Sequence, residues 1–208
     1  MGSNFGDLDN DGYLDFYLGT GYTAIFQLMP NVMYHNMGGK QFADVTVSGG
    51  FGHLQKGHAI AFADFDNDGD QDIFEQMGGA YLADKFYDAL YENPGFGNSW
   101  ITVKLVGVRS NSSAIGARIR VDVAAENDAR RTIYKHVNSG GTFGANPLRQ
   151  TIGLGNASII DKLEILWPRT GKSQTFKNVP LNATIEIVEG IDALKPIPVW
   201  PTRLGGTK

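Results

Sequence analysis

The chain of 208 residues contains no cysteine. This absence excludes disulfides, thiolate metal sites and cysteine nucleophiles, although it leaves secretion possible. No apolar run approaches the roughly 18 residues that a membrane-spanning helix needs. No segment is rich in lysine or arginine, so we expect no nucleic-acid partner. The first residues, 1–6, have neither a charged n-region nor an apolar h-region, and we recognise no signal peptide there.

Acidic residues are instead concentrated in two nine-residue loops, 7–15 and 64–72. Each loop has carboxylates at positions 1, 3, 5 and 9 and a glycine after the third carboxylate. Repelling charges at this density need a counter-ion, and a hard cation with six to eight oxygen ligands, Ca2+, suits them. Position 7 is expected to ligate through its backbone carbonyl, whatever its side chain. The predicted ligands of about two Ca2+ ions are Asp7, Asp9, Asp11, Tyr13, Asp15, Asp64, Asp66, Asp68, Asp70 and Asp72.

Two other interpretations of these loops are weaker. A solvated Asp/Asn/Gly turn explains one loop, but it does not explain the same four carboxylates and glycine twice. The second loop, with Glu75, also fits the EF-hand pattern. The first loop has Leu18 in place of that glutamate, and the flanks read as strands where an EF-hand needs helices. Gln71 also stands at the eighth position of the second loop, where an EF-hand is expected to have an apolar residue.

The two loops belong to a repeat with an offset of 57 residues, and its register continues without a gap. It pairs Phe5 with Phe62, Gly21 with Gly78, Tyr34 with Tyr91, Asn36 with Asn93 and Gly38 with Gly95. A repeat of this length predicts a structural unit that stacks on its copies. Short aromatic and β-branched runs predict strands at 15–18, 33–35, 41–46, 72–75 and 90–92. Residues 80–91 also have a rough helical spacing, although the repeat favours an extended end.

The stretch Phe5-Gly6-Asp7-Leu8-Asp9-Asn10-Asp11-Gly12 resembles the FG-GAP (VCBS-type) repeat of integrin α-chain propellers. That resemblance implies a β-propeller with Ca2+ in a hairpin loop of each blade. The second copy has Ala63 in place of Gly6. Since a closed propeller needs at least four blades, we expect a fragment that lacks blades of a longer chain. Two blades leave open strand edges and an uncovered apolar face, which predicts poor stability or a sticky surface.

The second half has a different pattern. A turn-rich stretch at 93–98 precedes alternating apolar segments at 100–106, 119–123, 132–137, 162–167 and 184–188. Five or more short strands with little helix signal predict a β-sandwich. Three prolines between 191 and 208 indicate an extended tail or linker.

This half resembles the ASPIC/UnbV domain, and with the repeats the chain resembles the cartilage acidic protein-like family. The matching stretches are 98–101, 110–118 (Ser-Asn-Ser-Ser-Ala-Ile-Gly-Ala-Arg), 153–155 and 163–168. The expected fold class is all-β: a partial β-propeller of two FG-GAP-type repeats, then a β-sandwich-like ASPIC/UnbV domain. The expected divisions are 1–97 for the repeats, 98–190 for the domain and 191–208 for the Pro-containing tail.

The function that these features predict is a calcium-binding structural and interaction module of extracellular type rather than an enzyme. An extracellular, periplasmic or cell-surface location and an unknown protein or glycan ligand are expected. One alternative is a carbohydrate-binding module, with stacking candidates Tyr22, Tyr81, Tyr87 and Trp100. The other is an enzyme or an accessory protein of a biosynthetic pathway (UnbV-like), with a polar group around Arg118, His136 and Ser139.

Overall fold

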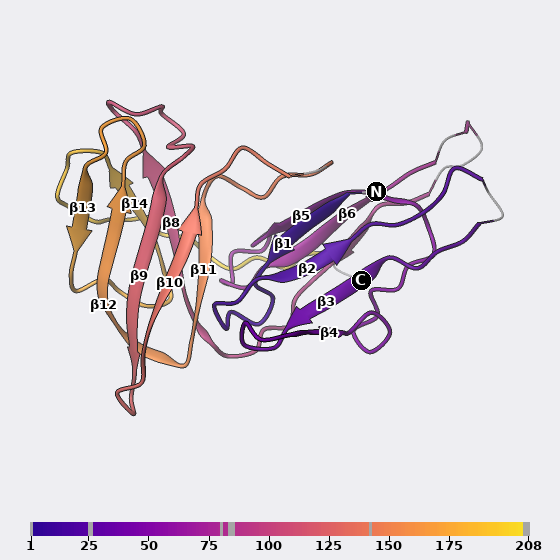
Figure 1. Cartoon of the computed structure of the whole chain (residues 1–208), viewed down its shortest axis with the longest axis horizontal. Helices are drawn as coiled ribbons and strands as arrows, with labels where there is room; N and C mark the ends of the chain where they lie inside the picture. Colours follow the sequence, from indigo (N-terminus) through magenta and orange to yellow (C-terminus); the bar gives the residue numbers. More distant parts are fainter. Residues whose placement is uncertain (1, 25–26, 80, 83–85, 142, 206–208) are drawn as a thin grey trace.

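The computed structural model describes residues 2–24, 27–79, 81–82, 86–141 and 143–205, and every regular element in these ranges is a β-strand. The fifteen strands form four sheets (Figure 1). The all-β fold expected from the sequence is confirmed.

The first two sheets are the two repeats. The first sheet contains, in order, β1 (Ser3–Gly6), β2 (Asp15–Leu18), β3 (Val32–Asn36) and β4 (Phe42–Asp44). The second contains β5 (Gly57–Ala63), β6 (Asp72–Met77) and β7 (Ala89–Tyr91). Each is an antiparallel meander, as in a propeller blade.

Strand pairing confirms the 57-residue repeat. Gly6 lies opposite Asp15 in the first sheet, and Ala63 lies opposite Asp72 in the second. The fourth strand differs between the copies, because the residues equivalent to β4 belong to β8 in the second half of the chain. Within the described residues, the second blade therefore has three strands. Of the stretch 80–91, residue 80 and residues 83–85 lie outside the described residues, and its end is extended in β7.

The two blades share a small core. Its fully buried members come from both sheets and are Tyr17, Met33, Ile60, Phe62 and Ile73. The opposite side of the first blade carries a row of stacked rings across β1, β2 and β3. Phe5 stacks on Phe16 at 4.9 Å between centroids, and Phe16 stacks on Tyr34 at 6.1 Å. Phe5 is 47% exposed, so this face agrees with the uncovered apolar face expected for a partial propeller.

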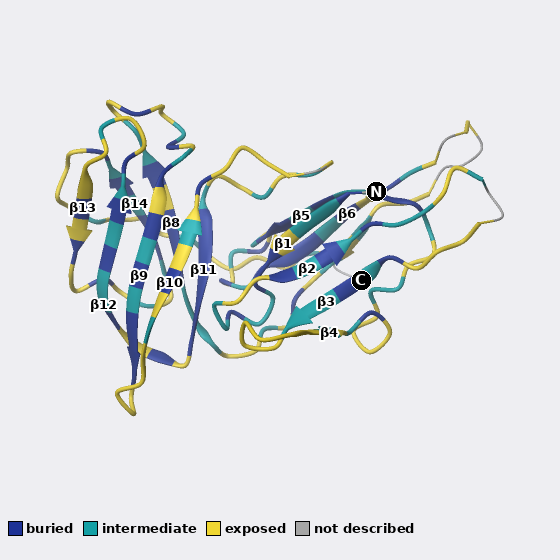
Figure 2. Ribbon diagram, viewed as in Figure 1, coloured by how far each residue is buried: buried dark blue, intermediate teal, exposed yellow. Residues whose placement is uncertain are grey.

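The other two sheets form the sandwich. One sheet has the order β10 (Arg130–His136), β9 (Arg118–Ala125), β12 (Ala157–Leu166) and β13 (Ser173–Phe176). The other has the order β11 (Gln150–Gly155), β8 (Ser99–Val106), β14 (Ala183–Val188) and β15 (Lys195–Pro196). The inner faces of both sheets contribute to one core, and Figure 2 shows the buried positions along their central strands.

The Pro-containing segment after residue 190 returns to the body of the protein. Lys195–Pro196 pairs with β14 as β15. Further along, the Thr202 amide donates a hydrogen bond of 2.6 Å to the Asp66 carbonyl in the second acidic loop. The segment therefore reaches from the sandwich to the repeats.

Candidate metal centres and the joint they form

Each acidic loop connects the first two strands of its blade. The structure brings together carboxylate oxygens of Asp7, Asp9 and Asp11 within 4.8 Å of one another. Oxygens of Asp64, Asp66 and Asp68 meet the same limit in the second loop. The first three predicted carboxylates of each loop therefore converge on one point.

The two loops have similar backbone conformations, with positive φ angles at equivalent positions. The glycines have positive φ, 89° at Gly12 and 100° at Gly69, as expected for a sharp turn around an ion. Asn10 and Asn67 also have positive φ, 54° and 61°. Asparagine is among the few residues that tolerate this region, and its place at position 4 of both loops is a signal that the sequence reading did not use.

Backbone amides orient the carboxylates from inside each loop. The Asp11 amide donates to Asp7 Oδ1 at 3.0 Å and to Asp9 Oδ1 at 3.3 Å. The Asp68 amide makes the same pair of contacts with Asp64 and Asp66, at 3.1 and 3.3 Å. These contacts hold the oxygen donors in place before any cation arrives.

The electrostatics of the loops disfavour bare carboxylates. Burial, followed by the charges of its acidic neighbours, raises the pKa of Asp7 to about 7. Burial and neighbouring carboxylates also raise the pKa of Asp66 and of Asp70 to about 6. A positive charge in each loop would relieve this repulsion. An all-oxygen donor set of this charge fits Ca2+.

The carboxylates at position 9 close the loops. Asp15 accepts hydrogen bonds from the amides of Leu8 and Asn36, each at 2.8 Å. Asp72 accepts the equivalent bonds from Phe65 at 2.9 Å and from Asn93 at 2.8 Å. This agreement extends the repeat beyond the loops.

The position-9 and position-7 residues are less uniform as potential ligands. Asp15 comes within 4.8 Å of Asp9, whereas Asp72 is not grouped with the other carboxylates of its loop. The Tyr13 ring lies under the Arg131 guanidinium, 5.3 Å from its centroid. The Asp70 carboxylate accepts a 2.6 Å hydrogen bond from the Asn10 side chain. Both position-7 side chains thus have other contacts, and ligation through their carbonyls remains a prediction.

The EF-hand interpretation is wrong for the second loop. Strands β5 and β6 flank it, and Glu75 is fully buried between the blades. The Tyr17 hydroxyl donates to Glu75 Oε2 at 2.8 Å. Glu75 is therefore a core residue and does not close the loop.

The buried Glu75 predicts a pH dependence of stability. Burial raises its pKa from 4.5 to about 7, against the lowering effect of the Tyr17 hydrogen bond. The folded protein then holds a proton that the unfolded chain has lost, so the stabilising contribution is complete below about pH 4.5 and is lost as the pH rises through about 7. We expect Glu75→Gln to raise the free energy of unfolding at pH 8 by up to about 3 kcal/mol.

Urea unfolding in saturating Ca2+ at pH 5 and pH 8 measures this effect. The variant should differ little from the wild type at pH 5, and the exposed control Glu126→Gln should follow the wild type at both values. Parallel pH profiles for wild type and Glu75→Gln would contradict this role for Glu75.

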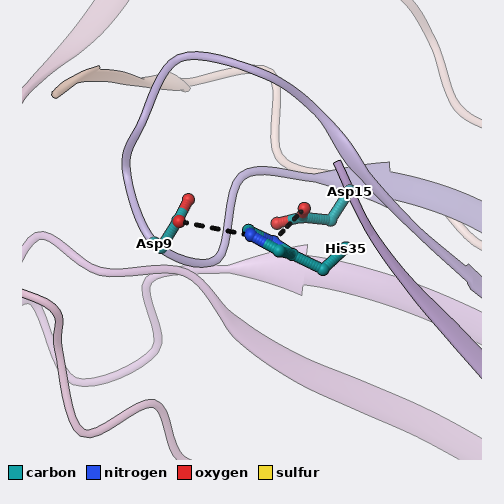
Figure 3. A group of neighbouring side chains, drawn as sticks. All are labelled: Asp9, Asp15 and His35. Atoms are coloured by element: carbon teal, nitrogen blue, oxygen red, sulfur yellow. Dashed lines mark hydrogen bonds and ion pairs between the residues drawn. The ribbon is translucent and has the colours of Figure 1, made fainter. Parts of the chain in front are cut away.

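His35 is a member of the first centre that the sequence reading missed. Its Nδ1 lies 3.0 Å from Asp15 Oδ1, and its Nε2 lies 3.8 Å from Asp9 Oδ2 (Figure 3). The ring comes from β3 and stands between the two carboxylates. The 57-residue offset places Glu92 at the equivalent position.

The first loop packs directly on the sandwich. The Gly155 amide of β11 donates a 2.7 Å hydrogen bond to the Asn10 carbonyl. Arg131 of β10 donates to the Asp11 carbonyl while its guanidinium covers Tyr13. Gly153 lies so close to Asp7 and Asn10 that a Cβ atom there would overlap both. The loop backbone is thus part of the interface between the two halves.

The second loop joins the same interface. Gln71 accepts a 2.9 Å hydrogen bond from the Asp7 amide and donates a 3.4 Å bond to the Thr151 carbonyl of β11. The EF-hand pattern has an apolar residue at this position, whereas the Gln71 side chain bonds with both the first loop and the sandwich. The Asn10 side chain also donates to the Gly69 carbonyl at 3.1 Å.

The Trp100 side chain packs in this interface. A Cβ atom on Gly69 would overlap the Trp100 indole, so the ring covers the second loop and is not free to stack on a sugar. The other stacking candidates, Tyr22, Tyr81 and Tyr87, are 56%, 56% and 96% exposed. They do not line the cavity of about 660 Å³ between the blades, whose aromatic lining residues are Phe51, Tyr91 and Phe96.

The polar group considered for an enzyme is only partly assembled. His136 and Arg118 lie opposite each other in β10 and β9. Both are exposed, as is Ser139, and none of the three lines the cavity between the blades.

The two acidic loops lie on two blade-like sheets that pack on a β-sandwich. This arrangement defines a repeat protein with an additional β-domain. Comparison with protein families gives the particular class. The model of the FG-GAP-like repeat matches residues 7–75, and the model named ASPIC and UnbV matches residues 107–193. The chain is therefore an FG-GAP-like repeat protein with an ASPIC/UnbV domain. A search of curated proteins found no match, and the described residues include no helix able to span a membrane.

Proposed function

We propose that this protein is a Ca2+-stabilised structural and interaction module. About two Ca2+ ions bind the loops 7–15 and 64–72. Each ion fixes the hairpin at the end of a blade, and the two fixed hairpins hold the repeats on the ASPIC/UnbV sandwich.

The observation that carries this proposal is the duplicated donor geometry inside a buried interface. In both loops three carboxylates converge within 4.8 Å, and backbone amides orient them in the same way. Asp7 is only 3% exposed, and an ionised carboxylate in such a place needs a partner charge. A bound cation supplies that charge and leaves little room for a substrate.

Because the two loops lie in the interface between the repeats and the sandwich, bound ions would also affect that interface. Asn10, Gln71 and Gly153 connect loop backbone and carboxylates to one another and to β11. Ordering the loops therefore also orders the contact between the two halves. The metal acts as a clamp and the assembled surface presents the binding site for a partner, a protein or a glycan.

We also propose that the module is of extracellular type, which the FG-GAP-like repeat and the ASPIC/UnbV domain support. Extracellular Ca2+ modules bind with Kd of about 10⁻⁴–10⁻³ M, a range that suits the calcium concentration outside the cell. We place this protein in an extracellular, periplasmic or cell-surface setting on this basis.

Thermal unfolding of EDTA-stripped protein with and without 10 mM Ca2+ tests the proposal. Binding at 100 times Kd stabilises the folded state by about 2.7 kcal/mol per site, or about 5 kcal/mol for two sites, so Tm should rise by roughly 10–20 °C. The paired variant Asp9→Ala, Asp66→Ala should lose most of the rise.

A matched control removes two acidic charges elsewhere, by Glu126→Ala and Asp161→Ala. Glu126 is exposed, and Asp161 makes a surface ion pair with Arg130, an interaction that contributes little. The control should keep the full response to Ca2+. Equal responses of the loop variant and the wild type would refute the proposal.

A second candidate function is binding of a small ligand between the blades. The cavity of about 660 Å³ there has mainly apolar walls and includes Tyr91 and Phe96, features of a ligand pocket. A glycan array supplies the first measurement, and no binding by the Ca2+-loaded protein would argue against a carbohydrate ligand.

A further inference from the structure

The two acidic loops differ at one neighbouring residue, and the difference changes the donor set. The repeat offset aligns His35 with Glu92. In the first repeat the imidazole stands between Asp9 and Asp15. In the second repeat the corresponding residues are Asp66, Asp72 and Glu92, whose side chains have only oxygen atoms as potential metal ligands. An imidazole nitrogen is a ligand that Ca2+ does not favour and that Zn2+ does.

The hydrogen bonds of Asp15 set the direction of the His35 ring. Asp15 is fully buried, and two backbone amides, of Leu8 and Asn36, hold its oxygens. It is therefore a fixed acceptor, and His35 Nδ1 donates its proton to Oδ1 across 3.0 Å. With Nδ1 as the donor, Nε2 carries the lone pair, and Figure 3 shows the ring between Asp15 and Asp9 with a contact to each. A histidine that donates one ring N–H to a carboxylate and offers the other nitrogen is the usual arrangement of a metal-ligating histidine.

The distance between His35 Nε2 and Asp9 Oδ2 fits two ligands of one ion. At 3.8 Å it is too long for a hydrogen bond. Two atoms that each lie about 2.0–2.2 Å from one Zn2+ ion can be separated by such a distance. Both side chains line the cavity between the blades, and their exposures of 30% and 22% leave the site open to solvent cations.

From these observations we propose that the first loop is a mixed nitrogen–oxygen site that prefers a first-row divalent cation of the Zn2+ type, bound by His35 Nε2 and Asp9. The second loop, with oxygen donors alone, remains a Ca2+ site. This inference rests on the proposed function, because it requires that the loops hold cations. It adds that the two centres select different ions.

A reciprocal exchange between the repeats tests the proposal. His35→Glu gives the first repeat the residue of the second, and Glu92→His does the reverse. The full chain is titrated with Zn2+ at saturating Ca2+, and Co2+ serves as a spectroscopic substitute whose visible absorption reports nitrogen ligation. The wild type should bind one Zn2+ in competition with Ca2+. His35→Glu should lose at least about tenfold in Zn2+ affinity, and Glu92→His should gain a second Zn2+ site.

The controls separate this proposal from adventitious binding and from failure of the loops themselves. His53→Gln removes an exposed histidine outside the centre and should leave Zn2+ binding unchanged. Ca2+ binding at both loops with equal Zn2+ affinity in wild type and His35→Glu would overturn the selectivity and leave the calcium proposal intact. Binding of neither ion would overturn both. Unchanged thermal unfolding of His35→Glu in Ca2+ shows that any loss of Zn2+ is local.

Discussion

Gly6→Ala is expected to lower the free energy of unfolding by about 1–3 kcal/mol, the range for forcing a methyl group into a packed core. A Cβ atom on Gly6 would overlap the ring of Phe62. Phe62 is fully buried among the other residues of the interblade core, so the ring cannot move without displacing its neighbours. The effect should appear as a lower urea midpoint with an unchanged slope, in saturating Ca2+.

The repeat provides the control for this prediction. Ala63 occupies the position equivalent to Gly6 in the second blade, so the strand geometry itself accepts alanine. Ala63→Gly should cost about 1 kcal/mol or less, the usual loss for glycine in a strand. If Gly6→Ala cost no more than this control, the packing of Phe62 over the first blade would be contradicted.

Gly153→Ala is expected to lower the Ca2+ affinity of the first acidic loop and to destabilise its contact with the sandwich. The added methyl group would overlap the Asp7 carboxylate and the backbone of Asn10. To relieve the overlap, Asp7 Oδ2 or the Asn10 backbone must move. Asp7 is a predicted ligand, so this movement would disturb the bound ion. We expect a loss of at least tenfold in Ca2+ affinity at one of two sites, measured by calorimetric titration, and a lower Tm.

Gly52→Ala is a suitable comparison for Gly153→Ala. It also adds a methyl group to a glycine in the repeats, but its nearest neighbour is Thr46 Cγ2 at 3.2 Å, away from both loops. It should leave Ca2+ binding unchanged. Normal affinity at both sites in Gly153→Ala would mean that the loop and the sandwich are independent.

The acidic loops and the repeat were predictable because their physics is local. Repelling carboxylates, a glycine in the positive-φ region and a fixed offset can all be read along the chain. The structure gives the loop glycines positive φ and brings oxygens of the first three carboxylates of each loop within 4.8 Å of one another. Most strands followed from alternating apolar residues in the same way.

The parts that the sequence did not reveal depend on contacts between distant segments. β11, which contains Gly153 and Gly155, was not among the strands expected from the sequence. In the structure these glycines allow the close approach of the first loop. In the sequence Gln71 was only a mismatch with the EF-hand pattern, which did not indicate its partners, the Asp7 amide and the Thr151 carbonyl. His35 reaches Asp9 and Asp15 only through the pairing of β2 and β3.

Trp100 shows the same limit. It was a candidate for stacking on a carbohydrate, whereas it packs on Gly69 of the second loop. The divergence of the second repeat after β7 brings it there, because the chain continues into the sandwich where the first repeat forms β4. Only the arrangement of the two halves gives this residue its role.

Calorimetric titration of Ca2+ into the EDTA-stripped full chain tests the central claim most directly. The metal-clamp account predicts two sites with Kd between micromolar and millimolar, of which both are lost in the paired variant Asp9→Ala, Asp66→Ala. The absence of binding at millimolar Ca2+ by a folded wild-type protein would contradict it, and the two loops would then be hydrogen-bonded turns.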